Sequence, residues 1–299
     1  MNNFGVQDMV SPLSRVIVQA PAATMAEAEP ELWHYADGLS RNALDSQHRE
    51  FIHRLEASGV EVITMDGTPD HLYDAIFTHD PSLISNAGAV LLRMGKVLRR
   101  EEVDVHERLY DKLGIPILGR IESPGTVECG DCVWLNQHSL IVGRGFRTNQ
   151  AGIEQLKALL EPTGVGVHVF DLPVYSGEAA CLHLMSLISM LDHDLALVYR
   201  PLLPVAFYRM LQEQGVQLIE APQDEFEASG TLSLNVLALK PRHGIMVDGF
   251  PLTKSAMEAA GCTIETFNGD SLCIKCEGGP TCLTRPLQRN QVQTPICNG

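Results

Sequence analysis

Apolar and polar positions recur along the chain in a loose repeat of about forty to fifty residues. Each unit predicts an apolar strand, a turn, a second apolar strand, an amphipathic helix and a third strand that glycine introduces. In the first unit, residues 15–19 predict a strand. Residues 41–57 carry apolar side chains at helical spacing, and Gly59 ends this helix before a strand at 60–64. The pattern indicates one α/β unit that is repeated along the chain.

Four more units follow the first. The second unit predicts strands 75–78 and 88–94, helix 103–112 and strand 114–119, and the third predicts strands 131–136 and 139–143, helix 150–160 and strand 165–172. The fourth predicts strands 182–191 and 195–199, helix 204–214 and strand 215–222. The fifth predicts strands 232–239 and 244–249, helix 253–260 and strand 262–267. A last segment, 271–287, predicts one more pair of strands with a Gly-Gly-Pro turn.

The first unit has fewer strands than the others, and the N- and C-terminal segments together can complete it. A chain that closes on itself in this way leaves no open sheet edge. We therefore predict a single α/β domain over residues 1–299, folded as a closed, propeller-like ring of five units. The alternative from periodicity alone is a two-domain protein with open α/β sheets, but no linker rich in Gly, Ser or Pro divides the chain.

The chain has 299 residues, of which 45% are apolar and 20% charged, and its formal net charge is −15. This acidic balance argues against nucleic-acid binding, since phosphate contacts need clustered Lys and Arg, and it suits a small cationic substrate. No apolar run approaches the ~18 residues of a membrane span and no signal peptide is visible, so we expect a cytoplasmic protein without a membrane partner. Eight cysteines in such a chain suggest free thiols. The oligomeric state stays open, a homo-oligomer included.

Candidate catalytic groups lie near the ends of predicted strands. Two glycines and a proline in EGGPTC place Cys282 on a tight turn, which suits a nucleophile. Asp80 is expected just past a strand end, and Glu128, Asp131 and His183 at strand starts, where all can face one centre of a ring. Each also has a plainer interpretation. Asp80 can be a turn residue before proline, Glu128 and Asp131 can be solvated carboxylates, and His183 can be a core histidine. Together, however, they form a set of a thiol, an imidazole and carboxylates that chance rarely assembles.

Five segments, FTHDPSLI, ECGDC, GRGFRTN, LHLMS and GGPTCLTRP, resemble in sequence and order the motifs of the guanidino-group-modifying superfamily. That superfamily contains arginine deiminases, dimethylarginine dimethylaminohydrolases and amidinotransferases. The resemblance extends from about Arg15 to Arg289; the chain length is most similar to the dimethylarginine dimethylaminohydrolase branch, whereas FTHDP is nearer the deiminase form. It implies a five-bladed α/β propeller, the pentein fold, in agreement with the repeat.

The resemblance also implies a reaction and the residues that perform it. The catalytic residues would be Cys282 as nucleophile, His183 as general acid and base, and Glu128. The substrate-binding residues would be Asp80, Arg93, Arg147, Phe77 and Asp131. The implied enzyme is a hydrolase that cleaves a guanidinium C–N bond of arginine, a methylated arginine or a related compound. It acts through a covalent S-amidino intermediate, releases a ureido product such as citrulline with an amine or ammonia, and needs no metal or organic cofactor. The alternative is an amidinotransferase that passes the amidino group to an amine.

Two carboxylates suit a guanidinium substrate, because they can fix it through charge-assisted hydrogen bonds with its central carbon facing a thiolate. We expect replacement of Asp80 or Glu128 by its amide to weaken substrate binding with little loss of stability, since both are interpreted as groups of a site rather than of the core. Met185, Cys129 and His79 stand where relatives have other residues. The substrate and the leaving amine therefore stay open.

Two Cys-x-x-Cys pairs suggest a rival class, a non-catalytic protein that binds zinc. The pairs are Cys129 with Cys132 and Cys273 with Cys276. About 140 residues separate the pairs, and both pairs are expected on strands, where residues three apart point to opposite faces. Zinc sites of the ribbon type place both pairs on turns within a few tens of residues, so this class is disfavoured.

Overall fold

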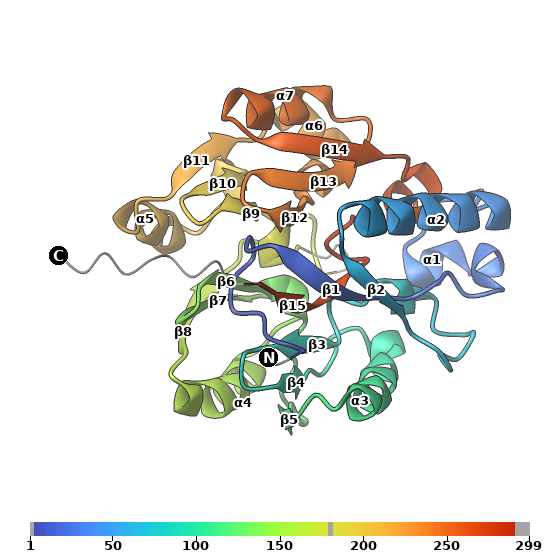
Figure 1. The fold of residues 1–299 in the computed structure, drawn as a ribbon, viewed down its shortest axis with the longest axis horizontal. Coiled ribbons are helices and arrows are strands. Elements are labelled where there is room, and N and C mark those ends of the chain that lie inside the picture. The colour runs from blue at the N-terminus through green and yellow to red at the C-terminus, as the bar shows by residue number, and fades with distance from the viewer. Residues whose placement is uncertain (1–2, 179–181, 291–299) are drawn as a thin grey trace.

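The computed structural model describes residues 3–178 and 182–290 and arranges five three-stranded sheets as blades around a ring (Figure 1). In every blade the middle strand pairs antiparallel with one neighbour and parallel with the other. An antiparallel pair can be joined by a short turn, whereas a parallel pair needs a longer crossover, which a helix provides here. The fold is therefore the five-bladed α/β propeller that the repeat and the resemblance predict.

The strands of the five blades match the predicted order of elements. They are β15 (Arg285–Arg289), β1 (Leu13–Val18) and β2 (Glu61–Thr64); β3 (Ser82–Ile84), β4 (Ala89–Leu91) and β5 (Ile117–Arg120); β6 (Cys132–Asn136), β7 (Ser139–Arg144) and β8 (Gly166–Asp171); β9 (Ile188–Asp192), β10 (Leu195–Val198) and β11 (Gln217–Glu220); and β12 (Leu237–Lys240), β13 (His243–Val247) and β14 (Thr263–Phe267). The first strand named in each blade is called its inner strand below.

The C-terminal strand β15 completes the blade that begins at the N-terminus. It pairs antiparallel with β1, with Leu13 opposite Arg289 and Ile17 opposite Arg285, and β1 pairs parallel with β2 on its other side. This arrangement gives the first blade the same strand pattern as the other four. The prediction that the two terminal segments share one blade is confirmed.

Of the two strands predicted in segment 271–287, the first does not form, because Asp270–Ile274 is a π-helix. The first N–H groups of a helix have no partner within it. Here the side-chain oxygen of Gln47 accepts hydrogen bonds from the backbone nitrogens of Ser271 at 2.9 Å and Leu272 at 2.8 Å. Gln47 lies on a helix of the first blade, so local sequence pattern gives no sign of this contact.

Five helices provide the crossovers between the second and third strands of the blades. They are α2 (Arg41–Ala57), α3 (Glu102–Leu113), α4 (Gln150–Leu160), α5 (Val205–Glu213) and α7 (Pro251–Ala259). The bounds of α2 and α4 are those predicted, and the other three differ by one or two residues at each end. Two short helices were not predicted, α1 (Pro30–Trp33) and α6 (Gln223–Ala228).

The strand predicted at 75–78 is wrong, since Tyr73–Ile76 forms a 3-10 turn and the strand begins only at Ser82. The Asp74 carboxylate holds this turn, accepting hydrogen bonds from the Tyr35 hydroxyl at 2.7 Å and from Lys96 Nζ at 2.6 Å. Asp80 therefore precedes a strand instead of following one. The strands predicted from residues 182 and 232 also begin late, after short 3-10 turns. An irregular segment thus leads into each of these inner strands.

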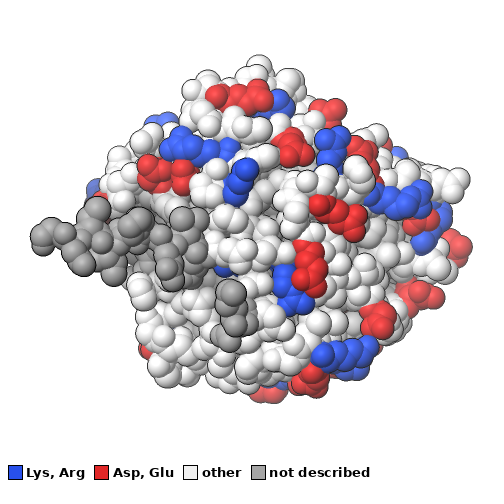
Figure 2. All heavy atoms as spheres, viewed as in Figure 1, with Lys and Arg blue, Asp and Glu red and all other residues white. Residues whose placement is uncertain are grey.

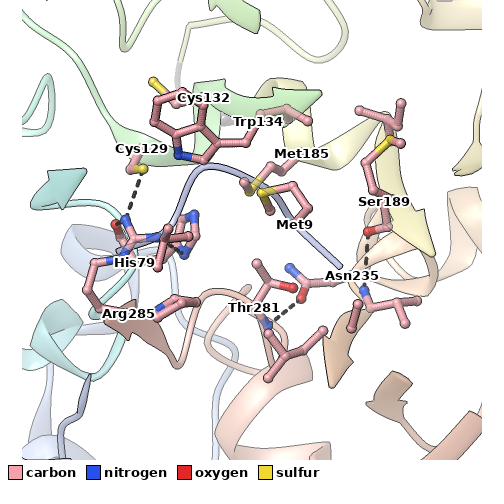
Figure 3. A pocket seen from close by; sticks show the side chains of 18 of the residues that line it. Met9, His79, Cys129, Cys132, Trp134, Met185, Ser189, Asn235, Thr281 and Arg285 are labelled. Carbon is pink, nitrogen blue, oxygen red and sulfur yellow. Dashed lines mark hydrogen bonds between the residues drawn. The ribbon is translucent and has the colours of Figure 1, made fainter. Parts of the chain in front are cut away.

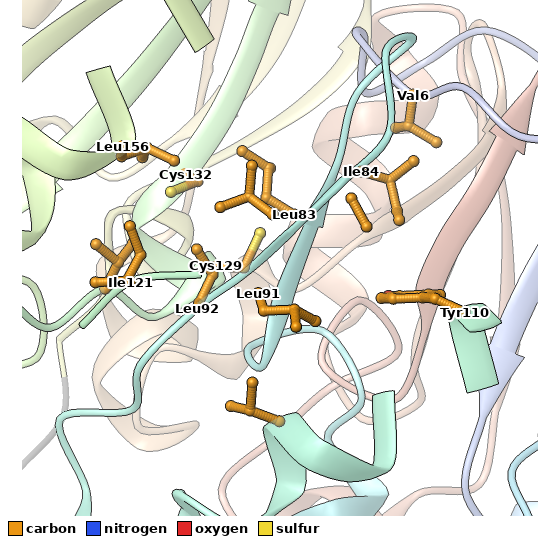
Figure 4. Close-up of a cluster of buried hydrophobic side chains, with 14 of the residues drawn as sticks. Val6, Leu83, Ile84, Leu91, Leu92, Tyr110, Ile121, Cys129, Cys132 and Leu156 are labelled. Atoms are coloured by element: carbon orange, nitrogen blue, oxygen red, sulfur yellow. The ribbon is translucent and has the colours of Figure 1, made fainter. Parts of the chain in front are cut away.

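Apolar side chains of adjacent blades pack into shared clusters. Figure 4 shows part of one such cluster, in which Leu83 of β3 and Leu91 of β4 lie near Cys132 of β6. Tyr110 of α3 and Leu156 of α4 are fully buried in the same cluster. The second and third blades therefore share a hydrophobic core, which fits the expected single domain.

Charged side chains of both signs are interspersed on the face shown in Figure 2, and Lys and Arg form no continuous patch there. Ion pairs between charged side chains also occur in the structure, such as Arg242 with Asp192 at 2.7 Å. This face offers no basic surface of the kind that nucleic-acid phosphates need. Among the described residues, no helix has both the length and the apolar character required to cross a membrane.

Candidate active site

Five polar side chains occupy matching places in the five blades, each two to five residues before the inner strand. They are Asp80 before β3, Glu128 before β6, His183 before β9, Asn235 before β12 and Cys282 before β15. All five line one cavity with a volume of about 300 Å³. Because the blades repeat around a ring, equivalent positions meet near its axis. The fold thus brings together the thiol, imidazole and carboxylates that the sequence singles out.

Glu128 and His183 form a hydrogen-bonded pair at the wall of this cavity. His183 Nε2 lies 2.9 Å from Glu128 Oε2, and the Glu128 side chain is fully buried. The other carboxylate oxygen, Oε1, accepts hydrogen bonds from the backbone nitrogen of Lys96 at 3.1 Å and from Arg147 Nη1 at 3.3 Å. Burial raises the pKa of Glu128, but the hydrogen bond with His183 and the charges of His183 and Arg147 outweigh burial and lower the pKa to about 2. Glu128 is therefore ionised and orients the imidazole.

Asp80 belongs to a buried ion-pair network. Its Oδ2 accepts a hydrogen bond from Arg99 Nη1 at 2.7 Å, and its Oδ1 accepts one from the backbone nitrogen of Gly130 at 3.0 Å. Arg99 also contacts Glu102, with Nη2 at 2.9 Å from Oε2. Burial raises the pKa of Asp80, but the positive charges of Arg99 and the neighbouring histidines outweigh it and hold the pKa far below the ordinary value. Asp80 is a second permanent negative charge at the cavity wall.

Gly130 in the ECGDC motif allows the imidazole to lie close to the backbone. A Cβ atom at this position would lie 2.4 Å from His183 Nδ1, a distance that real side chains do not tolerate. Asp131 fixes the same loop from the other side, because its Oδ1 accepts a hydrogen bond from the backbone nitrogen of Leu184 at 3.0 Å. Burial raises the pKa of Asp131 to about 6. These contacts fix where the His183 ring sits.

Cys282 is half-buried at the cavity wall, and Asn235 Nδ2 lies 3.1 Å from its sulfur. The side-chain oxygen Oδ1 of Asn235 accepts a hydrogen bond from the backbone nitrogen of Thr281 at 2.9 Å, so one side-chain amide contacts both Thr281 and Cys282. Burial and the Asp80 charge raise the pKa of Cys282, and Asn235 and His183 offset only part of this rise. These surroundings therefore favour the protonated thiol at neutral pH.

The glycines before Cys282 serve a different purpose from the one predicted. Gly278 and Gly279 do not adopt positive φ; Glu277 does, with φ of 61°. A Cβ at Gly278 would lie 2.2 Å from the Phe77 ring, and one at Gly279 would lie 2.4 Å from the Asn235 side chain. The glycines thus permit close packing behind the nucleophile.

The remaining predicted substrate-binding residues occupy different environments. Phe77 and Arg147 line the cavity, whereas Arg93 and Asp131 are not among its lining residues in the part of the chain that the structure describes. Arg93 Nη1 donates to the backbone oxygen of Gly125 at 3.2 Å. A role in substrate binding stays a prediction for all four side chains.

Comparison with known proteins agrees with this geometry. The arginine deiminase family model matches residues 68–207. An N(G),N(G)-dimethylarginine dimethylaminohydrolase of Pseudomonas aeruginosa is 28% identical over 270 residues, which cover 90% of this chain and 97% of the relative. A crystal structure of the P. aeruginosa enzyme complexed with citrulline has a TM-score of 0.73 at 24% identity and covers 91% of this chain and 98% of that chain. An amidinotransferase of saxitoxin biosynthesis from Microseira wollei has a TM-score of 0.79 at 18% identity, with coverages of 97% and 98%.

The comparisons support a likeness to the guanidino-group-modifying superfamily, near its dimethylarginine dimethylaminohydrolase and arginine deiminase branch. The five-bladed propeller is the fold that this chain shares with the two solved structures. The resemblance seen in the sequence motifs and the comparisons thus point to the same superfamily.

Three polar residues of the cavity wall were missed in the sequence. Asn235 stands in LSLNVLAL at the place that the other four site residues occupy in their units, so the repeat itself offered the signal. Arg99 and Lys96 line the cavity but follow no strand pattern. Lys96 Nζ lies 5.1 Å from the centroid of the Trp33 ring and bonds to Asp74. Their placement depends on tertiary contacts.

The two Cys-x-x-Cys pairs lie in different parts of the core. Cys129 and Cys132 belong to the cluster between the second and third blades, whereas Cys273 and Cys276 pack in the cluster beneath α2. Both pairs were expected on strands, but only Cys132 lies on one, at the start of β6, whereas Cys129 lies in a 3-10 turn and Cys273 in the π-helix. Within residues 3–178 and 182–290, no group of three or more His, Cys, Asp or Glu side chains is arranged to hold a metal ion.

Proposed function

We propose that this protein is a hydrolase that cleaves a C–N bond of a small cationic guanidino compound, with Cys282 as the nucleophile. The observation that supports this most is the convergence of Cys282, His183, Glu128 and Asp80 on one cavity of about 300 Å³. The names of the relatives support the same reaction class, since dimethylarginine dimethylaminohydrolases and arginine deiminases act on guanidino groups.

Two buried carboxylates with low pKa values give the cavity its cation preference. Asp80 and Glu128 keep their negative charges at any pH near neutral. A guanidinium group that donates to both oxygens of such carboxylates forms charge-assisted hydrogen bonds, and its plane and central carbon are fixed by their fork geometry. We infer that this places the carbon in front of Cys282 Sγ.

The raised pKa of the Cys282 thiol makes nucleophile activation depend on the substrate. A bound guanidinium adds a positive charge beside the sulfur and favours the thiolate, and the thiol proton passes to His183 as the cation binds. The sulfur then bonds to the guanidinium carbon. The C–N bond breaks as protonated His183 gives its proton to the leaving amine, and the amidino group remains on sulfur.

Water completes the reaction. His183, held by Glu128, removes a proton from a water molecule that attacks the amidino carbon. The S–C bond breaks, the ureido product leaves and Cys282 regains a proton. Each step uses groups of this chain, the substrate and water.

The substrate class includes arginine, a methylated arginine or a related guanidino compound with an anionic group. Arg147, at 16% side-chain exposure, lines the cavity beside Glu128 and presents a cation that can bind a substrate carboxylate. The product in that case is a ureido amino acid such as citrulline.

An amidinotransferase is the second candidate, because the fold is also shared with the amidinotransferase from M. wollei. Both reactions form the same S-amidino intermediate, and they differ in whether water or an amine discharges it. Incubation with a panel of guanidino compounds in ¹⁸O-labelled water, followed by product mass, separates them. A hydrolase forms labelled ureido product without any added amine. A transferase accumulates the adduct until an acceptor such as glycine or lysine is added. If no guanidino compound is consumed by either route, the proposed function is wrong.

A further inference from the structure

A second, enclosed cavity lies on the axis of the ring behind the candidate active site. Residues from the inner strand of every blade line it, among them Leu83 of β3, Trp134 of β6, Ser189 of β9, Ala238 of β12 and Arg289 of β15. Figure 3 shows the wall of this axial cavity. His79, Met185 and Asn235 line both cavities, so the two are separated by a single layer of side chains.

The axial cavity concentrates buried polar atoms that have no hydrogen-bond partner within the described residues. Eight such atoms occur in the part of the chain that the structure describes, and five of them belong to side chains that line this cavity. They are His79 Nε2, Trp134 Nε1, Thr281 Oγ1, Arg285 Nε and Arg289 Nε. In Figure 3, His79 and Arg285 lie together on one side of the cavity, and Trp134 and Thr281 approach it from two other sides.

Most of these atoms are hydrogen-bond donors. The indole nitrogen of Trp134 and the Nε atoms of Arg285 and Arg289 each carry a hydrogen and cannot accept. Buried N–H groups without a partner are rare in native proteins, because an unmade hydrogen bond costs about 1–3 kcal/mol of desolvation. The cavity therefore fits an occupant that accepts several hydrogen bonds at once.

The charge of the wall is positive. Two arginines and a histidine line the axial cavity, and no Asp or Glu is among its lining residues. Arg285 has an anionic partner available, because its Nη1 donates to Cys129 Sγ at 3.0 Å. Burial raises the pKa of Cys129, but hydrogen bonding with Cys132 and the charges of Arg285 and His79 lower it well below the ordinary value. The Cys129 sulfur is thus a partner that favours the Arg285 charge.

Arg289 lacks such a partner. Its Nη1 and Nη2 donate to the backbone oxygens of Ser11 at 2.7 Å and Ala238 at 2.9 Å, and no ion pair to it occurs among the described side chains. Burial lowers the pKa of Arg289 to about 10, and the Asp8 carboxylate offsets this only in part. An isolated buried charge is costly unless a counter-charge is near.

We propose that the axial cavity is a binding site for a small monovalent anion such as chloride, held by Arg289, Arg285, Trp134 and Thr281. The cavity volume is about 30 Å³, and a water-sized position needs roughly 10–15 Å³ on the same measure. The space therefore has room for a monatomic anion of halide size. Ordered water is the competing occupant. It accepts hydrogen bonds from the same donors but adds no negative charge beside Arg289, which the Asp8 carboxylate stabilises only in part.

The site connects to the turn that carries Cys282. Thr281 faces the axial cavity, its backbone nitrogen donates to Asn235 Oδ1 at 2.9 Å, and Asn235 Nδ2 lies 3.1 Å from Cys282 Sγ. The backbone nitrogen of His79 donates to the Cys282 carbonyl at 3.2 Å. An anion in the axial cavity thus holds the wall behind the nucleophile, and its binding does not depend on the substrate.

Crystals of the full chain soaked in sodium bromide and measured at the bromine absorption edge test the site without a variant. We expect an anomalous difference peak within hydrogen-bond distance of Arg289 Nε and Trp134 Nε1. Bromide at surface sites with only water density in the axial cavity would overturn the proposal.

Thermal unfolding in sodium chloride and in sodium gluconate at equal concentration gives a solution test. An anion that binds only the folded state raises Tm with concentration, so wild type is expected to unfold at higher temperature in chloride. Thr281→Val removes one hydrogen-bond donor with little change of shape, so this variant should lose part of the rise in Tm that chloride gives. In gluconate it should be at least as stable as wild type, because the buried Thr281 hydroxyl of wild type has no partner there. Thr263→Val, the same change on an exposed strand position, should keep the full increment. Equal chloride increments in wild type and Thr281→Val contradict the site.

Discussion

Asp80→Asn removes one negative charge from a buried ion pair while it keeps the size and shape of the side chain. In wild type, Asp80 Oδ2 lies 2.7 Å from Arg99 Nη1, and the two side chains are 7% and 6% exposed. The hydrogen bond from the Gly130 nitrogen to Oδ1 can persist with an amide oxygen. The substitution therefore isolates the contribution of the charge.

Removal of one member of a buried ion pair typically destabilises a protein by about 3–5 kcal/mol, because the other charge stays buried without compensation. Arg99 keeps Glu102, with Nη2 at 2.9 Å from Oε2, and also donates to the backbone oxygen of Phe77 at 3.0 Å. We therefore place the loss of unfolding free energy at the lower end, about 3 kcal/mol. The sequence alone led to the opposite expectation of little stability loss, since the partner Arg99 was not recognised.

Urea denaturation at neutral pH measures this loss as a lower transition midpoint with an unchanged m value. Asp171→Asn is the matched control, since Asp171 is exposed and pairs with Arg144 at the surface. We expect no measurable change in that control. If Asp80→Asn unfolds at the same urea concentration as the control, the Asp80–Arg99 pair makes no net contribution and the reasoning fails.

The contribution of Asp80 to the free energy of unfolding depends on pH. The pKa of Asp80 in the folded protein lies far below its ordinary value, because its cationic neighbours outweigh burial. The unfolded chain therefore takes up a proton first, at about pH 3.9, and the folded chain only at lower pH. The stability that Asp80 contributes is fully present above this unfolded pKa and is lost as pH falls toward the folded pKa. The difference in unfolding free energy between wild type and Asp80→Asn should shrink below about pH 4.

Gly130→Ala should lower kcat/KM at least about a hundredfold with the fold intact, because its Cβ would lie 2.4 Å from His183 Nδ1 and displace the ring; unchanged steady-state kinetics would contradict this. The alkylation rate of Cys282 by iodoacetamide should rise with pH through an apparent pKa above the usual cysteine value of about 8.5, since burial disfavours the thiolate; a rate already at its plateau at neutral pH argues against a substrate-activated thiol. Arg147→Met should raise KM for arginine more than for agmatine, which lacks the carboxylate, and Arg93→Met, outside the cavity lining, should have the smaller effect; equal effects on both substrates assign Arg147 to structure.

Hydrophobic periodicity predicted most of the fold because the repeat is local and recurs five times. The helices α2 and α4 have the predicted bounds, and β15 joins the first blade as expected. The errors occur where distant side chains decide local structure. Gln47 caps the π-helix at Asp270–Ile274, and Asp74 holds the 3-10 turn that replaces the strand predicted at 75–78. Neither contact leaves a periodic pattern.

The sequence predicted only part of the candidate site, because some of its residues are placed by contacts between distant segments. Cys282, His183 and Glu128 lie in motifs that resemble those of a known superfamily, and the structure brings them to one cavity. Asn235 occupies the same position in its own unit but belongs to no motif that the sequence singled out. Arg99 is recognisable only once the fold places it beside Asp80.

The identity of the modified cysteine tests the proposed mechanism most directly. The chain has eight cysteines, and of the six that the structure describes, Cys282 is half-buried at the cavity wall while the others are buried in the core. Acid quenching during turnover of a reactive guanidino substrate, followed by peptide mass spectrometry, should find the amidino adduct on Cys282. The adduct should persist longer in His183→Ala, because the same imidazole activates the water. An adduct on another cysteine, or full activity in Cys282→Ser, would contradict the assignment of Cys282 as the nucleophile.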